Sequence, residues 1–167
     1  CLATADFLGL AEDDAVKALL AAGIIGVFIA REATFSAEIG GCQAECGSAS
    51  GMSAAGLVTL AGGSLEQAIA AASMALQSSL GMICDPIANR VEAPCLGKNT
   101  LAAANALTAA NMALAGFDPL IPFDEVVVVM DQVGRSLPHA LRCTGLGGLS
   151  VTKTAREIEE RLKQARK

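Results

Sequence analysis

The sequence predicts an all-α fold, a compact bundle of small-residue helices in a single domain that spans residues 1–167. The segment Ser64–Gln67 has the pattern of a capping box, which is typical of a helix N-terminus. The pair Gly62-Gly63 comes directly before it, and glycine often stands where a helix ends. The chain has no Trp or Tyr and only five Phe. We therefore expect a core formed by close approach of helix backbones rather than by large rings.

Local signals support six helices in order along the chain. The first has Glu12, Asp13 and Asp14 near its N-terminus, where the helix dipole favours acidic groups. The second has very small side chains and ends at a glycine pair, the third begins at the capping box, and the fourth ends at a glycine. The last begins at a second capping box, Thr154–Glu157. The six expected helices cover residues 11–33, 45–61, 64–80, 99–115, 124–135 and 154–167.

The fifth of these segments, DEVVVVMDQVGR at 124–135, carries conflicting signals. Four consecutive valines favour a β-strand, because branched side chains fit a pleated surface. Asp124 as an N-cap, further acidic residues after it and Gly134 as a stop favour a helix. We expect a helix here. The segment 34–42 is expected to be irregular, because Gly40-Gly41 interrupts it.

Charge and hydropathy exclude two classes of partner. The net charge is −5, and basic residues cluster only in the tail 153–167, where acidic residues alternate with them. Nucleic-acid binding needs a concentrated positive surface, so we expect none. The mean hydropathy of +0.50 arises largely from three charge-free runs, 46–65, 67–84 and 99–117. Because these runs are rich in Ala, Gly and Ser and lack aromatic belts, we expect buried helices and no membrane span.

The six cysteines are the main candidates for chemistry: Cys1, Cys42, Cys46, Cys84, Cys95 and Cys143. A disulfide framework is disfavoured, because such frameworks belong mostly to small, loop-rich secreted domains. Cys42 comes just before an expected helix, Cys84 just after one and Cys95 just before the next. Helix ends can meet at one pole of an antiparallel bundle, and helix N-termini favour the thiolate form. Cys46 and Cys143 are interpreted as packing residues.

The cysteine spacing leaves three interpretations open: an iron–sulfur cluster, a zinc site, or buried thiols without a ligand. Three thiolates from loops suit an iron–sulfur cluster that keeps one iron open. Structural zinc usually has four ligands in tight pairs, and here only Cys42 and Cys46 are close in sequence. His139 follows Pro138 and is expected in a loop or at the surface rather than as a ligand.

Three stretches of sequence resemble one protein family. GGCQAECGSASGMSAAG, CDPIANRVEAPC and LRCTGLGGLSVTKT are similar to the iron–sulfur-dependent L-serine dehydratases (L-serine ammonia-lyases), specifically to their α-chain or the equivalent catalytic domain. The likeness runs from about Ala22 to the end of the chain. The resemblance implies an all-α domain that converts L-serine to pyruvate and ammonia. It also implies a [4Fe-4S] cluster whose open iron acts as a Lewis acid on the serine hydroxyl.

The resemblance also implies which residues form the site. Matched by motif, the cluster ligands are Cys42, Cys84 and Cys95. The pair Lys98-Asn99 follows the last ligand and is the candidate for substrate binding, because a substrate carboxylate requires a cation or helix N-terminal amides. No catalytic residue is assigned from the sequence.

Members of this family carry a second module, either as a separate β-chain or fused to the α-domain, and nothing like it occurs in this sequence. We expect this chain, which begins at Cys1, to be a fragment of the α-domain that works with such a β-module. We also expect L-serine as the ligand, an oligomer, and a cytoplasmic location. The alternatives are a hydro-lyase acting on another hydroxy acid, or a non-catalytic helical domain with a structural zinc site.

Overall fold

The computed structural model describes residues 1–165, which contain helices and turns and no β-strand. The prediction of an all-α fold is confirmed, and the valine-rich segment is a helix. The elements in chain order are α1 (Leu2–Leu8), α2 (Glu12–Glu32), α3 (Ala37–Gly40), the π-helical turn η1 (Gln43–Gly47), α4 (Ser48–Leu60), α5 (Leu65–Gln77), α6 (Cys95–Leu114), α7 (Phe123–Ser136), the short 3₁₀ helices η2 (His139–Leu141) and η3 (Gly148–Val151), and α8 (Lys153–Gln164).

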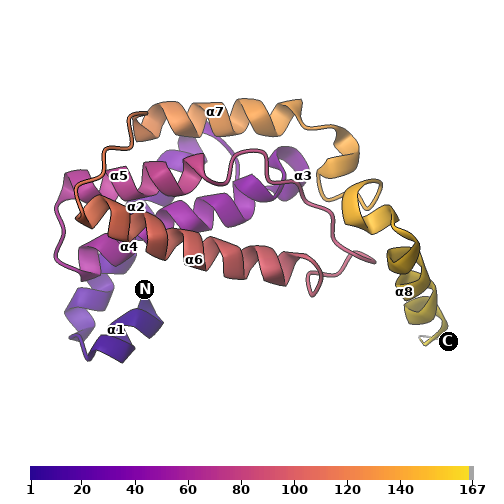
Figure 1. The fold of residues 1–167 in the computed structure, drawn as a ribbon, viewed down its shortest axis with the longest axis horizontal. Helices are drawn as coiled ribbons and strands as arrows, with labels where there is room; N and C mark the ends of the chain where they lie inside the picture. Colours follow the sequence, from indigo (N-terminus) through magenta and orange to yellow (C-terminus); the bar gives the residue numbers. More distant parts are fainter. Residues whose placement is uncertain (166–167) are drawn as a thin grey trace.

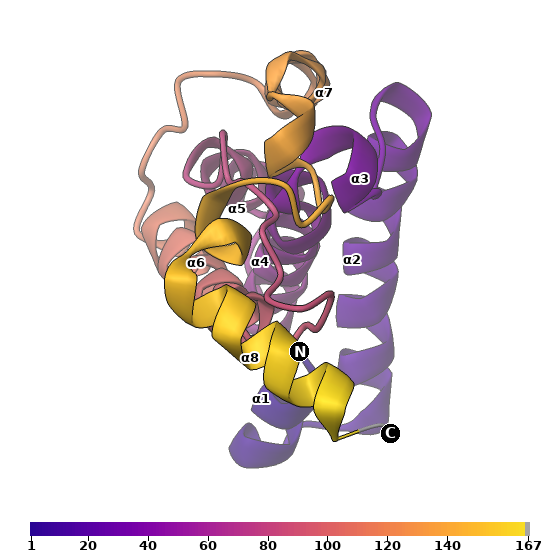
Figure 2. The same cartoon turned by 90° about the vertical axis from the view of Figure 1, so that its right-hand side faces the viewer.

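Helix α4 lies at the centre of the bundle and packs against α2, α5 and α6. Figure 1 shows α5 and α6 running beside α4, with α7 along one edge of the bundle. Figure 2 shows α2 on the opposite side of α4 from α5 and α6. Helix α8 packs mainly on η3 and projects away from the bundle (Figure 1). The long helices form the body of the bundle, and Cys42, Cys84 and Cys95 lie in or at the ends of the segments that connect them.

The core between α4, α5 and α6 is built largely from alanine, as the composition predicts. Larger side chains that are fully buried are few, and among them are Ile29, Leu76 and Met130. The buried alanines of these three helices include Ala54, Ala55, Ala71, Ala72, Ala75, Ala106, Ala109, Ala110 and Ala113. Such small side chains let the helix backbones approach closely, so the interior is filled by main chain as much as by side chains.

The two expected capping boxes have different outcomes. In the first, the Ser64 hydroxyl accepts a hydrogen bond from the main-chain N–H of Gln67 at 3.2 Å, and the side-chain Oε1 of Gln67 accepts one from the Ser64 N–H at 2.9 Å. The prediction at Ser64 is confirmed. The prediction at Thr154 is wrong, because the chain is already helical at Lys153 and the N-cap is Thr152, whose hydroxyl accepts from the Ala155 N–H.

Tertiary packing shifts several other helix boundaries. Helix α6 begins at Cys95, so this cysteine lies in the first helical turn rather than before it. The stop expected at Gly134 is wrong, and α7 continues to Ser136. A Cβ atom at position 134 would lie 2.7 Å from the Cα of Gly40, so glycine is required here for the contact between α7 and α3. Helices α1 and α3 were not expected from the pattern of the sequence.

Helix α2 exposes a row of apolar side chains on one face. Leu20, Ile24 and Val27 are all more than half exposed, and their spacing places them along the same side of the helix. Among residues 1–165 there is no helix that combines the length and the apolar character needed to cross a membrane.

His139, at the start of η2, is exposed, which confirms its expected place at the surface.

Substitution of alanine for glycine at two helical positions is expected to have opposite effects. Gly134→Ala should lower the free energy of unfolding by about 1–3 kcal/mol, because the added methyl group must displace the α3 backbone. Gly23→Ala in α2 is the matched control, since a Cβ there meets no atom within 4 Å. It should raise the free energy of unfolding by about 0.5–1 kcal/mol. Urea unfolding followed by circular dichroism measures both, and equal effects would contradict the packing role of Gly134.

Candidate metal centre

The structure brings the three predicted cysteine ligands together in one buried cluster. Cys42 lies between α3 and η1, Cys84 lies in the segment after α5, and Cys95 is the first residue of α6. All three are at most 7% exposed and pack with Ala37, Cys46 and Ala102. Three separate segments of the chain therefore place their sulfur atoms together.

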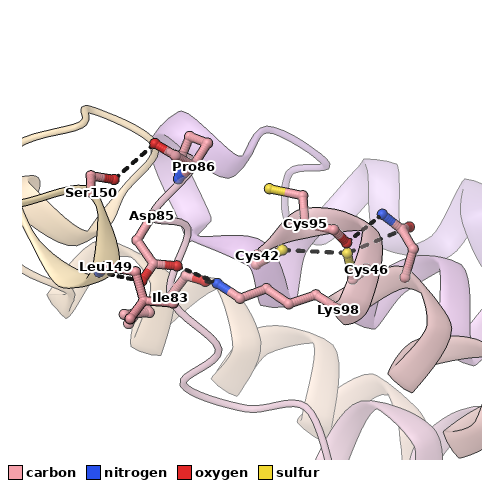
Figure 3. Close-up of polar contacts among 10 residues, drawn as sticks. Cys42, Cys46, Ile83, Asp85, Pro86, Cys95, Lys98, Leu149 and Ser150 are labelled. Carbon is pink, nitrogen blue, oxygen red and sulfur yellow. Dashed lines mark hydrogen bonds and ion pairs between the residues drawn. The ribbon is translucent and has the colours of Figure 1, made fainter. Parts of the chain in front are cut away.

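We call the side chains of Cys42, Cys46, Cys84 and Cys95 the thiol cluster. Distances between its atoms and their neighbours define two close groups of donors. The Cys42 Sγ lies 3.3 Å from the Cys46 Sγ (Figure 3). The Cys42 Sγ, the Cys84 Sγ and a carboxylate oxygen of Glu45 all lie within 4.8 Å of one another. Glu45 is exposed and was not singled out from the sequence, although its spacing of three residues from Cys42 places both on one helical face.

Cys46 and Cys143 were interpreted from the sequence as packing residues, but the structure places both beside the predicted ligands. Cys46 belongs to the thiol cluster, and Cys143 is partly buried against it. The N–H of Cys143 donates to the Cys84 carbonyl at 2.8 Å, and the N–H of Cys84 donates to the Leu141 carbonyl at 2.9 Å. The spacing of four residues between Cys42 and Cys46 was the signal in the sequence that they share a helical face.

The chain next to Cys42 is held in place by a tight glycine turn and by the buried side chain of Gln43. Gly41 has a φ of +72°, and a Cβ there would lie 2.8 Å from the Met82 carbonyl oxygen. The Gln43 N–H donates to this same carbonyl at 3.0 Å. The Gln43 side chain donates from Nε2 to the Met130 carbonyl at 2.7 Å and accepts from the Gly81 N–H at 2.8 Å. These bonds fix the Cys42 segment against both α7 and the segment that leads to Cys84.

Contacts within the thiol cluster shift the cysteine pKa values in opposite directions. Hydrogen bonding with the Cys84 thiol lowers the pKa of Cys42 to about 6, and Cys46 contributes less, while burial acts in the opposite direction. Burial is the main cause that raises the pKa of Cys46 to about 12. The hydrogen bond to Cys42, followed by burial, raises the pKa of Cys84, and burial raises the pKa of Cys95. Cys42 is therefore the most acidic of the four sulfurs when no metal is bound.

Lys98 forms a buried ion pair beside the thiol cluster. Its Nζ donates to the Asp85 Oδ1 and to the Ile83 carbonyl, both at 2.6 Å (Figure 3). The second Asp85 oxygen accepts from the Leu149 N–H at 2.8 Å. The side chains of Lys98 and Asp85 are 17% and 3% exposed. Burial lowers the pKa of Lys98, but Asp85 outweighs this effect and the net pKa is raised. Lys98 therefore connects α6 to the segment that follows Cys84.

Asn99, the second predicted substrate-binding residue, lies against the thiol cluster. Its Nδ2 donates to the Cys95 carbonyl at 3.0 Å, and its Oδ1 lies 3.6 Å from the Cys46 Sγ. A cavity of about 70 Å³ also borders Cys46, and Ser50, Ser79 and Asn105 contribute to its lining. The structure thus places the Asn99 amide in contact with a sulfur of the thiol cluster, whereas the Lys98 ammonium group binds Asp85.

Comparisons with known proteins cover nearly all of this chain. A family model described as "Serine dehydratase alpha chain" matches residues 1–150, which include the thiol cluster and the Lys98–Asp85 pair. An L-serine dehydratase alpha chain from Peptoniphilus asaccharolyticus is 53% identical over 134 residues, 80% of this chain and 46% of that protein. Probable L-serine dehydratase alpha chains from Bacillus subtilis and Latilactobacillus sakei are 48% and 47% identical over 147 residues, 88% of this chain in each case.

These matches cover 49% of the Bacillus subtilis protein and 70% of the Latilactobacillus sakei protein. The chain thus spans about half the length of the first two relatives and a larger share of the third. The family model, however, matches most of the chain described here. The chain therefore belongs to the serine dehydratase alpha chain family.

Proposed function

We propose that this chain supplies the metal-binding part of an enzyme that converts L-serine to pyruvate and ammonia. The observation that carries the proposal is the convergence of Cys42, Cys84 and Cys95, from three separate segments, in one buried cluster. The relatives named as L-serine dehydratase alpha chains support the choice of L-serine as substrate. Because the chain covers about half of those relatives, the activity is proposed for its assembly with a β-chain or a fused β-module.

The residues present fit a [4Fe-4S] cluster as the resident cofactor. Iron–sulfur clusters are held by cysteine thiolates, and the chain offers Cys42, Cys84 and Cys95 as three such donors from irregular segments and a helix start. When bound, such a cluster with one iron free of protein ligands supplies a Lewis acid that assists the departure of hydroxide. This assistance matters because hydroxide is a poor leaving group, water having a pKa of about 15.7.

In the proposed reaction the serine loses its α-proton and its hydroxyl group, and the resulting enamine hydrolyses to pyruvate and ammonia. The protein's own contribution is to hold the three thiols in a site closed to bulk water. We propose that Asn99 contacts the substrate, because its amide lies beside the thiol cluster. We propose that Lys98 acts mainly as a positioning residue, because its ammonium group already binds Asp85 and Ile83.

A zinc site is the second candidate, and one specific observation favours it. The group formed by Cys42, Glu45 and Cys84 mixes sulfur and oxygen donors, which zinc accepts more readily than an iron–sulfur cluster does. In that case Cys95 would not be a ligand. The two candidates therefore differ in the metal they bind and in whether Cys95 is needed.

Anaerobic reconstitution with iron and sulfide should yield about four irons per chain with visible absorbance and a spin-resonance signal typical of a cluster. Separate Cys42→Ser, Cys84→Ser and Cys95→Ser variants should each lose most of that iron, because a serine hydroxyl is a harder ligand than a thiolate. Cys1→Ser is the matched control, since Cys1 lies outside the thiol cluster, and it should retain the iron. Stoichiometric zinc that survives Cys95→Ser but not Glu45→Gln would refute the cluster.

The substrate is tested with the reconstituted chain and an added β-chain. Pyruvate should form from L-serine, and a hydroxy acid without the amino group should give no corresponding product. Iron binding without any turnover of L-serine, together with dehydration of such a hydroxy acid, would replace the proposed activity by that of another hydro-lyase.

Removal of the Lys98 ammonium group should lower the stability of the fold as well as disturb the site. Lys98→Met is expected to lower the free energy of unfolding by about 3–5 kcal/mol, because it leaves the Asp85 carboxylate buried without its partner. Lys17→Met is the matched control, because the Lys17–Asp14 pair is exposed and should contribute less than about 1 kcal/mol. Urea unfolding of the metal-free chain measures both, and similar small losses would mean that the Lys98–Asp85 pair has no special structural role.

A further inference from the structure

Cys42 and Cys46 place two thiols in direct contact. Their sulfur atoms lie 3.3 Å apart, and both residues are at most 1% exposed. Figure 3 shows the two sulfurs facing each other, with Cys46 in the π-helical turn η1 and Cys42 directly before it. Under the proposed function only Cys42 has a role as a ligand, so the closeness of Cys46 needs a separate explanation.

A covalent bond between these two sulfurs requires a local change of the backbone at the start of η1. Residues four apart in a helix have Cα atoms separated by about 6 Å, since each residue rises about 1.5 Å. Disulfides form where Cα atoms lie roughly 4.4–6.8 Å apart, and the S–S bond is about 2.05 Å long. The sulfurs at 3.3 Å can bond once the Cβ atoms, about 5–6 Å apart at this helical spacing, come to within about 3.5–4.5 Å of each other.

A small cavity borders one member of this pair. The cavity has a volume of about 70 Å³, lies between α4, α6 and the segment that follows α5, and has room for about two water molecules, since a water occupies about 30 Å³. Its lining is mostly apolar but includes Ser50 and Asn105 beside Cys46, so a small molecule with hydrogen-bonding groups finds polar partners there. A peroxide of the size of two waters fits this description, whereas a bulky thiol reagent does not.

We propose that Cys42 and Cys46 are an oxidative modification site, which hydrogen peroxide converts to a reversible disulfide when no metal is bound. One sulfur attacks a peroxide oxygen, the O–O bond breaks, and a sulfenic acid and water result. The other thiol attacks that sulfur, the S–S bond forms, the S–O bond breaks and a second water leaves. The two thiols lose two electrons and two protons in total, and the peroxide is reduced to two waters.

This modification protects the proposed ligand Cys42 from irreversible oxidation. A sulfenic acid without a nearby thiol proceeds to sulfinic acid, which ordinary thiols do not reduce, whereas a disulfide is restored by them. The inference deepens the proposed function, because Cys42 is a ligand only under that function. The bonding of the two sulfurs is tested without metal, so its failure and the failure of the cluster are separate results.

The full chain, freed of metal and reduced, is treated with hydrogen peroxide, blocked with an alkylating agent and digested with a protease that cleaves after glutamate. Glu45 lies between the two cysteines, so Cys42 is on peptide 39–45 and Cys46 on peptide 46–66, while Cys84 is on 67–92. Mass spectrometry should find 39–45 joined to 46–66 by a bond that dithiothreitol breaks. A dominant link from 39–45 to 67–92, or no link at all, would overturn the proposal.

Two variants complete the test. Cys46→Ser should abolish the link, and peptide 39–45 should then accumulate as sulfinic acid that dithiothreitol does not reverse. Cys143→Ser is the matched control, because Cys143 also lies against the thiol cluster, and it should retain the link. If Cys42 in the Cys46→Ser variant resists irreversible oxidation as well as it does in the unaltered chain, the protective role is refuted.

Discussion

The buried side chain of Gln43 is the interaction on which the arrangement of the site depends. Its amide binds the Met130 carbonyl of α7 on one side and the Gly81 N–H on the other, and its own N–H binds the Met82 carbonyl. Two of these bonds connect the chain after Cys42 to the chain before Cys84, and the third connects it to α7. Because a buried polar group without its partner is unfavourable by about 1–3 kcal/mol, separation of these segments would leave the Gln43 amide unsatisfied. The pairing of one polar side chain therefore helps to hold the two cysteines together.

The small-residue core explains why polar contacts rather than large side chains position the sulfurs. Alanine interfaces bring α4, α5 and α6 close together, and α7 reaches α3 only because position 134 is glycine. Such interfaces fix distances between helix axes but offer few bulky side chains to hold connecting segments. The segment that carries Cys84 is instead joined to α6 by the Lys98–Asp85 pair, and to residues 141–149 by hydrogen bonds at Cys84 and Asp85. Packing of small residues thus fixes how the helices are arranged, and buried polar contacts fix where the cysteine-bearing segments lie.

Local sequence signals predicted the helices well and their ends less well. The Ser64 box was correct because its bonds lie within four residues of chain. The box expected at Thr154 was wrong because the helix begins at Lys153, with Thr152 as its N-cap. The sequence motifs grouped the three candidate ligands, and the structure places them together. Asp85 as the partner of Lys98 and the proximity of Glu45 to Cys84 depend on tertiary contacts across α5 and α6, which no local pattern encodes.

The Lys98–Asp85 pair also limits how an anionic substrate could be recognised beside the thiols. From the sequence, Lys98 was the nearest cation to the last candidate ligand and so the natural partner of a carboxylate. In the structure the Lys98 ammonium group already donates to the Asp85 carboxylate. This carboxylate also accepts a hydrogen bond from the Leu149 N–H. A carboxylate that recruited Lys98 would have to leave Asp85 buried and unpaired, at a cost of several kcal/mol. The Asn99 amide has a second N–H besides the one that binds the Cys95 carbonyl, and this donor carries no such penalty. Recognition of a carboxylate at this site is therefore better served by amide dipoles than by the lysine charge.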